Sequence, residues 1–161
     1  MKKYISIDIG GTAIKYGIIC ENAEIILKET LRTEAWKGGP AILKKVIGIV
    51  EHLIEQTKGK ISGICISTAG MVDTKSGSIF YSAPLIPDYA GMEFKKTLED
   101  KFHIPCEVEN DVNCAASFTI SMSSSTNAGR GSLTAPSSSP SLIFRIALIT
   151  AYIFPCAEHI L

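Results

Sequence analysis

Hydrophobic and polar residues alternate along the first part of this chain. Isoleucine occupies every second position of residues 5–9, and the alternation resumes over residues 14–19. A period of two residues is typical of a β-strand that buries one face. After a turn at residues 21–23, the sequence E-I-I-L-K-E-T-L over residues 24–31 is consistent with a third strand. These three segments predict an antiparallel meander.

The pattern then changes to the period of a helix. Pro40 opens a segment whose apolar residues recur every three or four positions until the motif T-K-G-K at residues 57–60. Residues 61–67 form a continuous apolar run of strand length, which favours the middle of a covered sheet. Apolar residues four apart predict a shorter helix over residues 94–102, and residues 104–111 predict another short strand. Strands alternating with helices predict an α/β fold with a sheet flanked by helices.

The turn between the first two predicted strands carries the first candidate chemistry. It reads D-I-G-G-T, beginning at Asp8. Gly10 and Gly11 leave backbone N–H groups uncovered by side chains, so phosphate oxygens could approach them closely. Asp8 could hold a magnesium ion through water, while Thr12 adds a hydroxyl and Lys15 adds a cation. The alternative is an ordinary Gly-Gly hairpin turn with a solvated aspartate.

A second group of polar residues ends the last predicted strand. Glu109, Asn110 and Asp111 come together there and are followed by V-N-C-A-A, which indicates the start of a helix. Asp111 could accept a proton from a substrate hydroxyl, and Asn110 could form a hydrogen bond with a neighbouring hydroxyl. The alternative is that Asn110 or Asp111 caps the helix. One residue can do both.

These motifs together resemble the N-terminal half of the ROK family of bacterial repressors, open-reading-frame proteins and sugar kinases. The resemblance covers residues 1–116 and rests on D-I-G-G-T from Asp8, on S-T-A-G ending at Gly70, and on E-N-D-V-N-C-A-A from Glu109. ROK proteins belong to the actin-like, hexokinase-type ATPases. The resemblance therefore implies an N-terminal lobe of the ribonuclease H-like type, with a mixed sheet flanked by helices.

The resemblance also implies a role for each motif. The first motif would handle the ATP phosphates and the metal, and Asp111 would be the general base that takes the proton from the sugar 6-hydroxyl. Glu109 and Asn110 would bind the sugar, and Gly70 would belong to the loop that closes on it. The family usually has proline before that glycine, where this chain has Ala69. We expect a less rigid loop as a result.

The end of the chain departs from this description. Residues 117–141 are rich in serine and have no hydrophobic period, and such segments cannot bury enough apolar surface to fold. Residues 142–157 are apolar but shorter than the roughly 20 residues that span a bilayer. The second phosphate loop and the zinc cluster of the family are not readable here. We interpret residues 117–161 as an irregular tail translated in a shifted frame after Ala116, or alternatively as the disordered tail of a natural short paralogue.

The composition of the whole chain limits the kinds of partner that the protein is expected to bind. The 16 basic and 16 acidic residues balance, which argues against a nucleic-acid-binding surface. Five cysteines without a C-x-x-C pair indicate neither a disulfide framework nor a zinc site. We expect no signal peptide before the first strand, because Lys2 and Lys3 are followed directly by the alternating pattern. We expect a cytoplasmic protein that binds neither nucleic acid nor a membrane.

The predicted function is that of an ATP- and magnesium-dependent sugar kinase. Its substrate would be glucose or a related hexose such as N-acetylmannosamine or a β-glucoside, and the full-length family form could be a homodimer. We expect the 161-residue chain to be truncated and inactive, because its sequence shows no second half of the site. The alternatives are a sugar-binding ROK-type regulator and a non-catalytic fragment. Neither would have a DNA-binding domain, since Asp8 lies too near the start of the chain for a winged helix to precede it.

Overall fold

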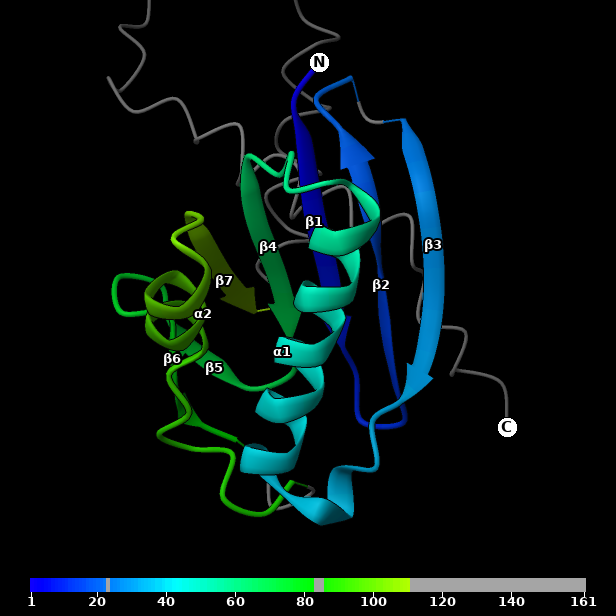
Figure 1. Ribbon diagram of the computed structural model, residues 1–161. Coiled ribbons are helices and arrows are strands. Elements are labelled where there is room, and N and C mark those ends of the chain that lie inside the picture. The colour runs from blue at the N-terminus through cyan, green and yellow to red at the C-terminus, as the bar shows by residue number, and fades with distance from the viewer. Residues whose placement is uncertain (23, 83–85, 111–161) are drawn as a thin grey trace, which may run out of the picture.

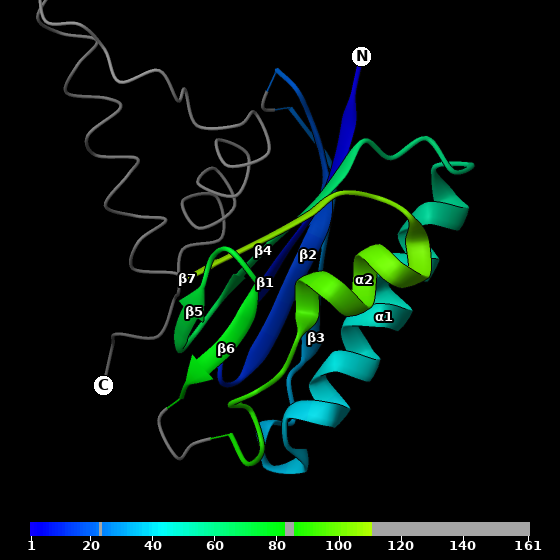
Figure 2. The same ribbon diagram turned by 90° about the vertical axis from the view of Figure 1, so that its left-hand side faces the viewer.

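The computed structural model describes residues 1–22, 24–82 and 86–110. They form a five-stranded sheet in the order β3-β2-β1-β4-β7, with the helices on one of its faces (Figure 1, Figure 2). The strands of this sheet are β1 (Lys3–Ile9), β2 (Ala13–Cys20), β3 (Ile25–Arg32), β4 (Gly63–Thr68) and β7 (Cys106–Asn110). The helices are the 3-10 helix η1 (Ala35–Lys37), α1 (Gly39–Gln56) and α2 (Phe94–Phe102), and a separate hairpin joins β5 (Met71–Asp73) to β6 (Ser78–Tyr81).

Strand β1 lies at the centre of the sheet. It pairs antiparallel with β2, which pairs antiparallel with β3, so the predicted meander is confirmed. On its other side β1 pairs in parallel with β4, and β4 pairs in parallel with β7. The sheet is therefore mixed. Because β1, β4 and β7 run in the same direction, their C-terminal ends meet at one edge, and the predicted site motifs stand at these ends.

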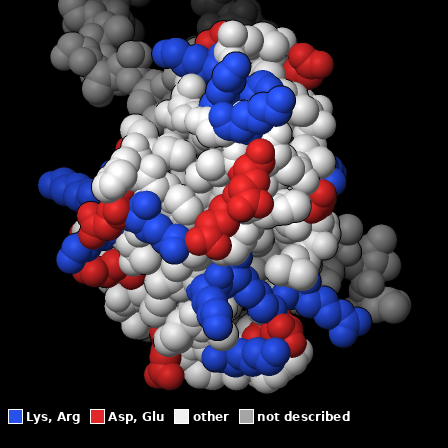
Figure 3. Space-filling model, viewed as in Figure 1, with Lys and Arg blue, Asp and Glu red and all other residues white. Residues whose placement is uncertain are grey.

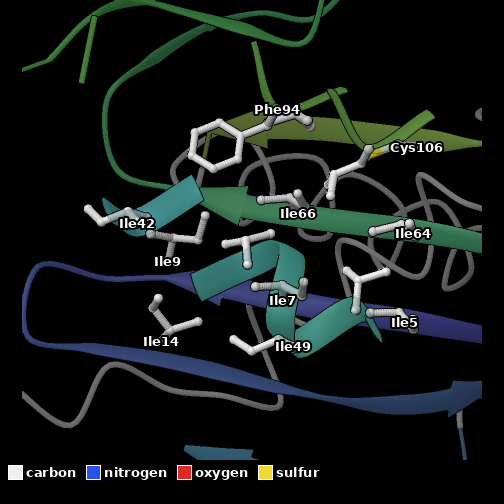
Figure 4. Packing of buried hydrophobic residues seen from close by; sticks show 14 of the residues in the cluster. Ile5, Ile7, Ile9, Ile14, Ile42, Ile49, Ile64, Ile66, Phe94 and Cys106 are labelled. Atoms are coloured by element: carbon white, nitrogen blue, oxygen red, sulfur yellow. The ribbon is translucent and has the colours of Figure 1, made fainter. Parts of the chain in front are cut away.

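The alternation along β1 sorts its side chains onto the two faces of the sheet. Ile5, Ile7 and Ile9 are at most 1% exposed and belong to the core that β1 forms with α1 and β4 (Figure 4). Ser6 and Asp8 project from the opposite face. Burying one such isoleucine contributes about 1.5–3 kcal/mol relative to leaving it exposed.

Helix α1 follows the predicted helical period and covers the sheet with its apolar side. Pro40 lies in its first turn, where a missing N–H removes no hydrogen bond. The Thr57 hydroxyl donates to the Leu53 carbonyl over 2.8 Å at the far end. There Lys58 and Gly59 adopt positive φ angles of 53° and 74°, which end the helix. The buried residues of the helix are Gly39, Ile42, Val46, Ile49, Val50 and Leu53.

The remaining predicted elements are also observed. The covered strand expected over residues 61–67 is β4, whose residues are all buried. The helix expected over residues 94–102 is α2, which packs its Phe94 ring into the core (Figure 4). The hairpin of β5 and β6 was not predicted as a pair of strands.

The surface on the side of α1 carries charges of both signs. Basic and acidic side chains are interspersed there (Figure 3). Among the helices of the described ranges, none has the length and apolar character needed to cross a membrane.

Candidate phosphate and sugar site

Three of the predicted site residues lie in one row across the sheet. The register pairs Asp8 with Lys15 of β2 on one side and with Ser67 of β4 on the other, and Ser67 in turn pairs with Glu109 of β7. Paired residues on adjacent strands project from the same face. Asp8, Lys15 and Glu109 therefore share the face that lies opposite α1.

Ser67 places an unusual polar atom in the middle of this row. Its Oγ atom is buried and has no hydrogen-bond partner among the residues that the structure describes. Leaving a buried hydroxyl unpaired costs about 1–3 kcal/mol. The row also contains the carboxylates of Asp8 and Glu109, so an ordered water or an oxygen ligand bound there could satisfy the hydroxyl. The sequence analysis included Ser67 in the motif S-T-A-G but gave it no role, because its neighbours depend on the register of parallel strands.

The turn between β1 and β2 is tight at Gly10 and open at Gly11. The Gly10 N–H donates to the Ala13 carbonyl over 3.0 Å, which closes the turn. A Cβ atom on Gly10 would lie 3.0 Å from that same oxygen, whereas a Cβ atom on Gly11 would meet nothing within 4 Å. Gly11 and Thr12 are both exposed. Their backbone, with the Thr12 hydroxyl, is the part of the turn that a ligand could approach.

The residues around this turn fit a hydrated magnesium ion bound together with phosphate. Asp8 is only partly exposed, and Lys15 lies opposite it across the β1–β2 pair. In the part of the chain that the structure describes, no three histidine, cysteine, aspartate or glutamate residues are grouped to hold a metal. Magnesium usually keeps several waters and binds through one or two carboxylates and substrate phosphates. Asp8 acting through water agrees with that chemistry.

The structure brings together two of the predicted sugar-binding residues. The side-chain amide of Asn110, at the end of β7, donates a hydrogen bond to the backbone carbonyl of Gly70, in the loop after β4. Gly70 has a φ of +106°, and a Cβ atom there would lie 3.0 Å from the Tyr81 carbonyl oxygen. The glycine is therefore required by the backbone and by the close approach of β6. The residue before it, Ala69, donates its N–H to the Ile9 carbonyl over 3.3 Å.

A buried tyrosine contacts the last residue of β4. The hydroxyls of Thr68 and Tyr89 lie 2.5 Å apart, and the Tyr89 ring packs edge-on against Phe94 at 5.8 Å between centroids. Burial raises the pKa of Tyr89 above its usual value, so its hydroxyl keeps its proton. Sequence analysis missed this contact, since Tyr89 lies in a loop with no pattern around it.

An open pocket of about 370 Å³ adjoins the turn. It is lined by Gly11, Thr12, Arg32, Glu34, Ala35 and Trp36. Trp36 is 70% exposed. Hydrogen bonds from Lys37 at 2.7 Å and from Lys45 at 2.5 Å lower the pKa of Glu34 to about 2, so this carboxylate stays ionised. The pocket lining therefore includes an ionised carboxylate that is paired with two lysines.

Asp111, the predicted general base, lies outside the described residues. The same holds for the predicted tail over residues 117–161. The described chain ends with Asn110, the residue directly before Asp111.

Comparison with known proteins decides the family. A sequence model of the ROK family matches residues 4–127. The chain belongs to the ROK family. The resemblance inferred from the three motifs is thereby confirmed, and so is the α/β fold of an actin-like, ribonuclease H-like lobe, which solved ROK kinases share.

Relatives within the ROK family are much longer than the part that matches. An uncharacterized protein of Clostridium perfringens is 53% identical over 116 residues, which cover 72% of this chain and 39% of that protein. A β-glucoside kinase of Listeria monocytogenes is 30% identical over 113 residues, which cover 70% of this chain and 36% of the kinase. A solved ROK family glucokinase from Streptomyces griseus, in complex with glucose and AMPPNP, matches with a TM-score of 0.60 and 29% identity. That match covers 71% of this chain and 35% of the glucokinase. This chain thus spans little more than a third of the length of each relative.

Proposed function

We propose that the protein acts as one lobe of an ATP-dependent sugar kinase that phosphorylates the 6-hydroxyl of a hexose. The observation that carries the proposal is the meeting of three motifs at one edge of the sheet. The glycine turn follows β1, Gly70 follows β4, and Asn110, which is hydrogen-bonded to Gly70, ends β7. Phosphoryl transfer depends on holding a phosphate donor and an acceptor hydroxyl in line. The glucokinase and the β-glucoside kinase among the relatives support this reaction.

The turn would supply the phosphate half of the site. The backbone of Gly11 and Thr12 would face phosphate oxygens, and Lys15 would add a positive charge. Asp8 would hold a magnesium ion through water. When bound, that ion would neutralise charge on the phosphates during transfer.

The other two motifs would supply the sugar half. Asn110 and Glu109 would bind sugar hydroxyls, and the Gly70 loop would close over the ring. Asn110 is also hydrogen-bonded to Gly70, so a movement of Asn110 on binding the sugar would move the Gly70 loop. Asp111 would accept the proton of the 6-hydroxyl as the oxygen attacks the phosphate. Glucose, N-acetylmannosamine and β-glucosides are the candidate substrates.

We also propose that the chain consists of two parts, of which only the first contributes to the site. Residues 1–116 would form this lobe, and residues 117–161 would contribute nothing to the site. The second phosphate loop and the nucleotide pocket would have to come from sequence that these residues do not supply. We therefore propose that the 161-residue chain has no sugar-dependent turnover by itself. A cytoplasmic location, where ATP and free hexoses are available, agrees with this function.

A completed chain tests the proposal. Residues 1–116 would be joined to the remaining sequence of the Clostridium perfringens relative, whose matching part is 53% identical. ADP release would then be measured with glucose, N-acetylmannosamine and a β-glucoside. We expect turnover with at least one sugar, and a fall on the order of 100-fold for Asp111→Asn, because the amide cannot take up the proton.

The variant and its control separate the two roles open to Asp111. Asp100→Asn, on the exposed side of α2, changes the same functional group away from the site and should leave turnover unchanged. Near-normal turnover of Asp111→Asn would mean that Asp111 only caps a helix. A folded chimera that turns over none of the three sugars would contradict the kinase proposal itself.

A further inference from the structure

Thr33, the residue that directly follows β3, forms two hydrogen bonds with the backbone of the glycine turn. Thr33 is 1% exposed, although it follows an edge strand. Its backbone N–H donates to the Thr12 carbonyl over 2.9 Å. Its hydroxyl donates to the Gly10 carbonyl over 2.7 Å. The two accepting carbonyls lie on either side of Gly11.

These two bonds determine where the N–H groups of the turn point. A peptide group is planar, and its C=O and N–H point in opposite directions in the trans form. The structure has no cis peptide bond among its described residues. Drawing the Gly10 carbonyl toward Thr33 therefore turns the Gly11 N–H away from Thr33. The exposed Gly11 would otherwise rotate freely, since it has no side chain and no atom close to its Cβ position.

Helix α1 fixes Thr33 in turn. The ammonium group of Lys45 donates to the Arg32 carbonyl over 2.7 Å and to the Thr33 carbonyl over 3.0 Å. It also donates to the Glu34 carboxylate over 2.5 Å. Lys45 thus holds three successive residues, Arg32, Thr33 and Glu34, which form the corner at the end of β3. The corner forms a continuous connection from the helix that covers the core to the turn at the sheet edge.

We propose that Thr33 is a positioning residue for phosphate binding, which orients the Gly11 N–H toward the ligand. This inference rests on the proposed kinase function, because it concerns the same phosphate site. Thr33 does not touch the phosphate; it acts through the peptide groups of the turn. Serine retains the hydroxyl that the role requires, whereas valine retains the shape and the backbone N–H but loses the hydroxyl donor.

The test uses the 161-residue chain and magnesium triphosphate as the probe. Thr33→Val and Thr33→Ser would be compared by amide NMR titration, following the Gly11 N–H. Thr57→Val is the matched control, since the Thr57 hydroxyl also donates to a backbone carbonyl, that of Leu53, but at the end of α1 farthest from the turn. Thermal unfolding of each variant would report the loss of stability separately.

We expect Thr33→Val to bind triphosphate about tenfold more weakly, the loss expected when one hydrogen bond no longer orients the turn. Thr33→Ser should stay within about twofold of the unchanged chain, and so should Thr57→Val, even if both valine variants unfold at lower temperature. Unchanged binding by folded Thr33→Val would overturn the role of Thr33 and leave the kinase proposal intact. Weakening by Thr57→Val equal to that of Thr33→Val would also overturn it, because the effect would then follow stability alone. If magnesium triphosphate shifted no amide signal of the turn in the wild-type chain, the turn would not bind phosphate. The proposed role of Thr33 would then be wrong as well.

Discussion

The Asn110 side chain holds the Gly70 carbonyl, so residues far apart in the sequence form one unit at the edge of the sheet. Strand β7 ends at the first residue and the loop after β4 contains the second. Displacing either residue should therefore displace the other. In the proposed site this would couple the placement of the sugar to the backbone of the loop that covers it.

Replacing Gly70 with alanine tests how strictly this loop is defined. The φ of +106° is rarely adopted by residues with a side chain, and the new Cβ atom would lie 3.0 Å from the Tyr81 oxygen. We expect a loss of about 1–3 kcal/mol in the free energy of unfolding, measured by urea denaturation. Gly48→Ala is the control, because its Cβ atom would meet nothing within 4 Å in the middle of α1. That change should stabilise the protein by up to about 1 kcal/mol. Equal effects of the two changes would contradict the prediction.

Replacing Asp8 with asparagine tests the metal proposal. The amide keeps the size of the side chain but removes the negative charge that attracts a hydrated cation. We expect the magnesium dependence of triphosphate binding to fall at least tenfold, as measured by calorimetric titration with and without magnesium. Binding of triphosphate without magnesium should change less or improve, because a negative charge has been removed beside the phosphates. If magnesium strengthened binding equally in both chains, Asp8 would not be the residue that holds the ion.

The corner at Glu34 gives the protein a defined response to acid. Hydrogen bonds from Lys37 and then Lys45 lower its pKa from 4.5 to about 2 in the folded chain. A carboxylate whose pKa is lower in the folded state contributes stability above its unfolded pKa and loses that contribution as the pH falls through the folded value. The stability due to Glu34 should therefore be complete at neutral pH and decline between about pH 4.5 and pH 2.

The difference between the unchanged chain and Glu34→Gln would measure this contribution. Urea denaturation of both chains at several pH values should show curves that differ at neutral pH and converge in the acid range. A constant difference over the whole range would show that the ion pairs of Glu34 add nothing. Because Glu34 is partly exposed, added salt should reduce the difference.

Elements with a long, clear period could be predicted from the sequence. Strand β1 and helix α1 each repeat their apolar residues often enough to identify both the element and its buried face. Strands β5 and β6 are too short for such a repeat, with three and four residues. The turn at residues 8–12 was found because glycine and aspartate have unusual backbone and charge properties whatever surrounds them.

The supporting residues of the site could not be predicted, for a different physical reason. Thr33 is an ordinary threonine until β3 brings it beside the turn, and Tyr89 becomes buried only when its loop reaches Thr68. Ser67 lies beside Asp8 only in one register of two parallel strands. Each of these roles depends on a partner distant in sequence. Local pattern therefore identified the residues with distinctive chemistry and missed those that hold them in place.

Adjacent residues of strand β1 serve two independent purposes, one in the core and one in the candidate site. Ile7 belongs to the core beneath α1, whereas Asp8 belongs to the opposite face, which carries the candidate chemistry. A lineage that no longer needed the reaction could vary Asp8 through many generations and still conserve Ile7, because the fold would continue to be selected. Such a lineage could therefore keep the fold long after the reaction was lost. Along β1, the residues that are retained and the residues that vary would then alternate.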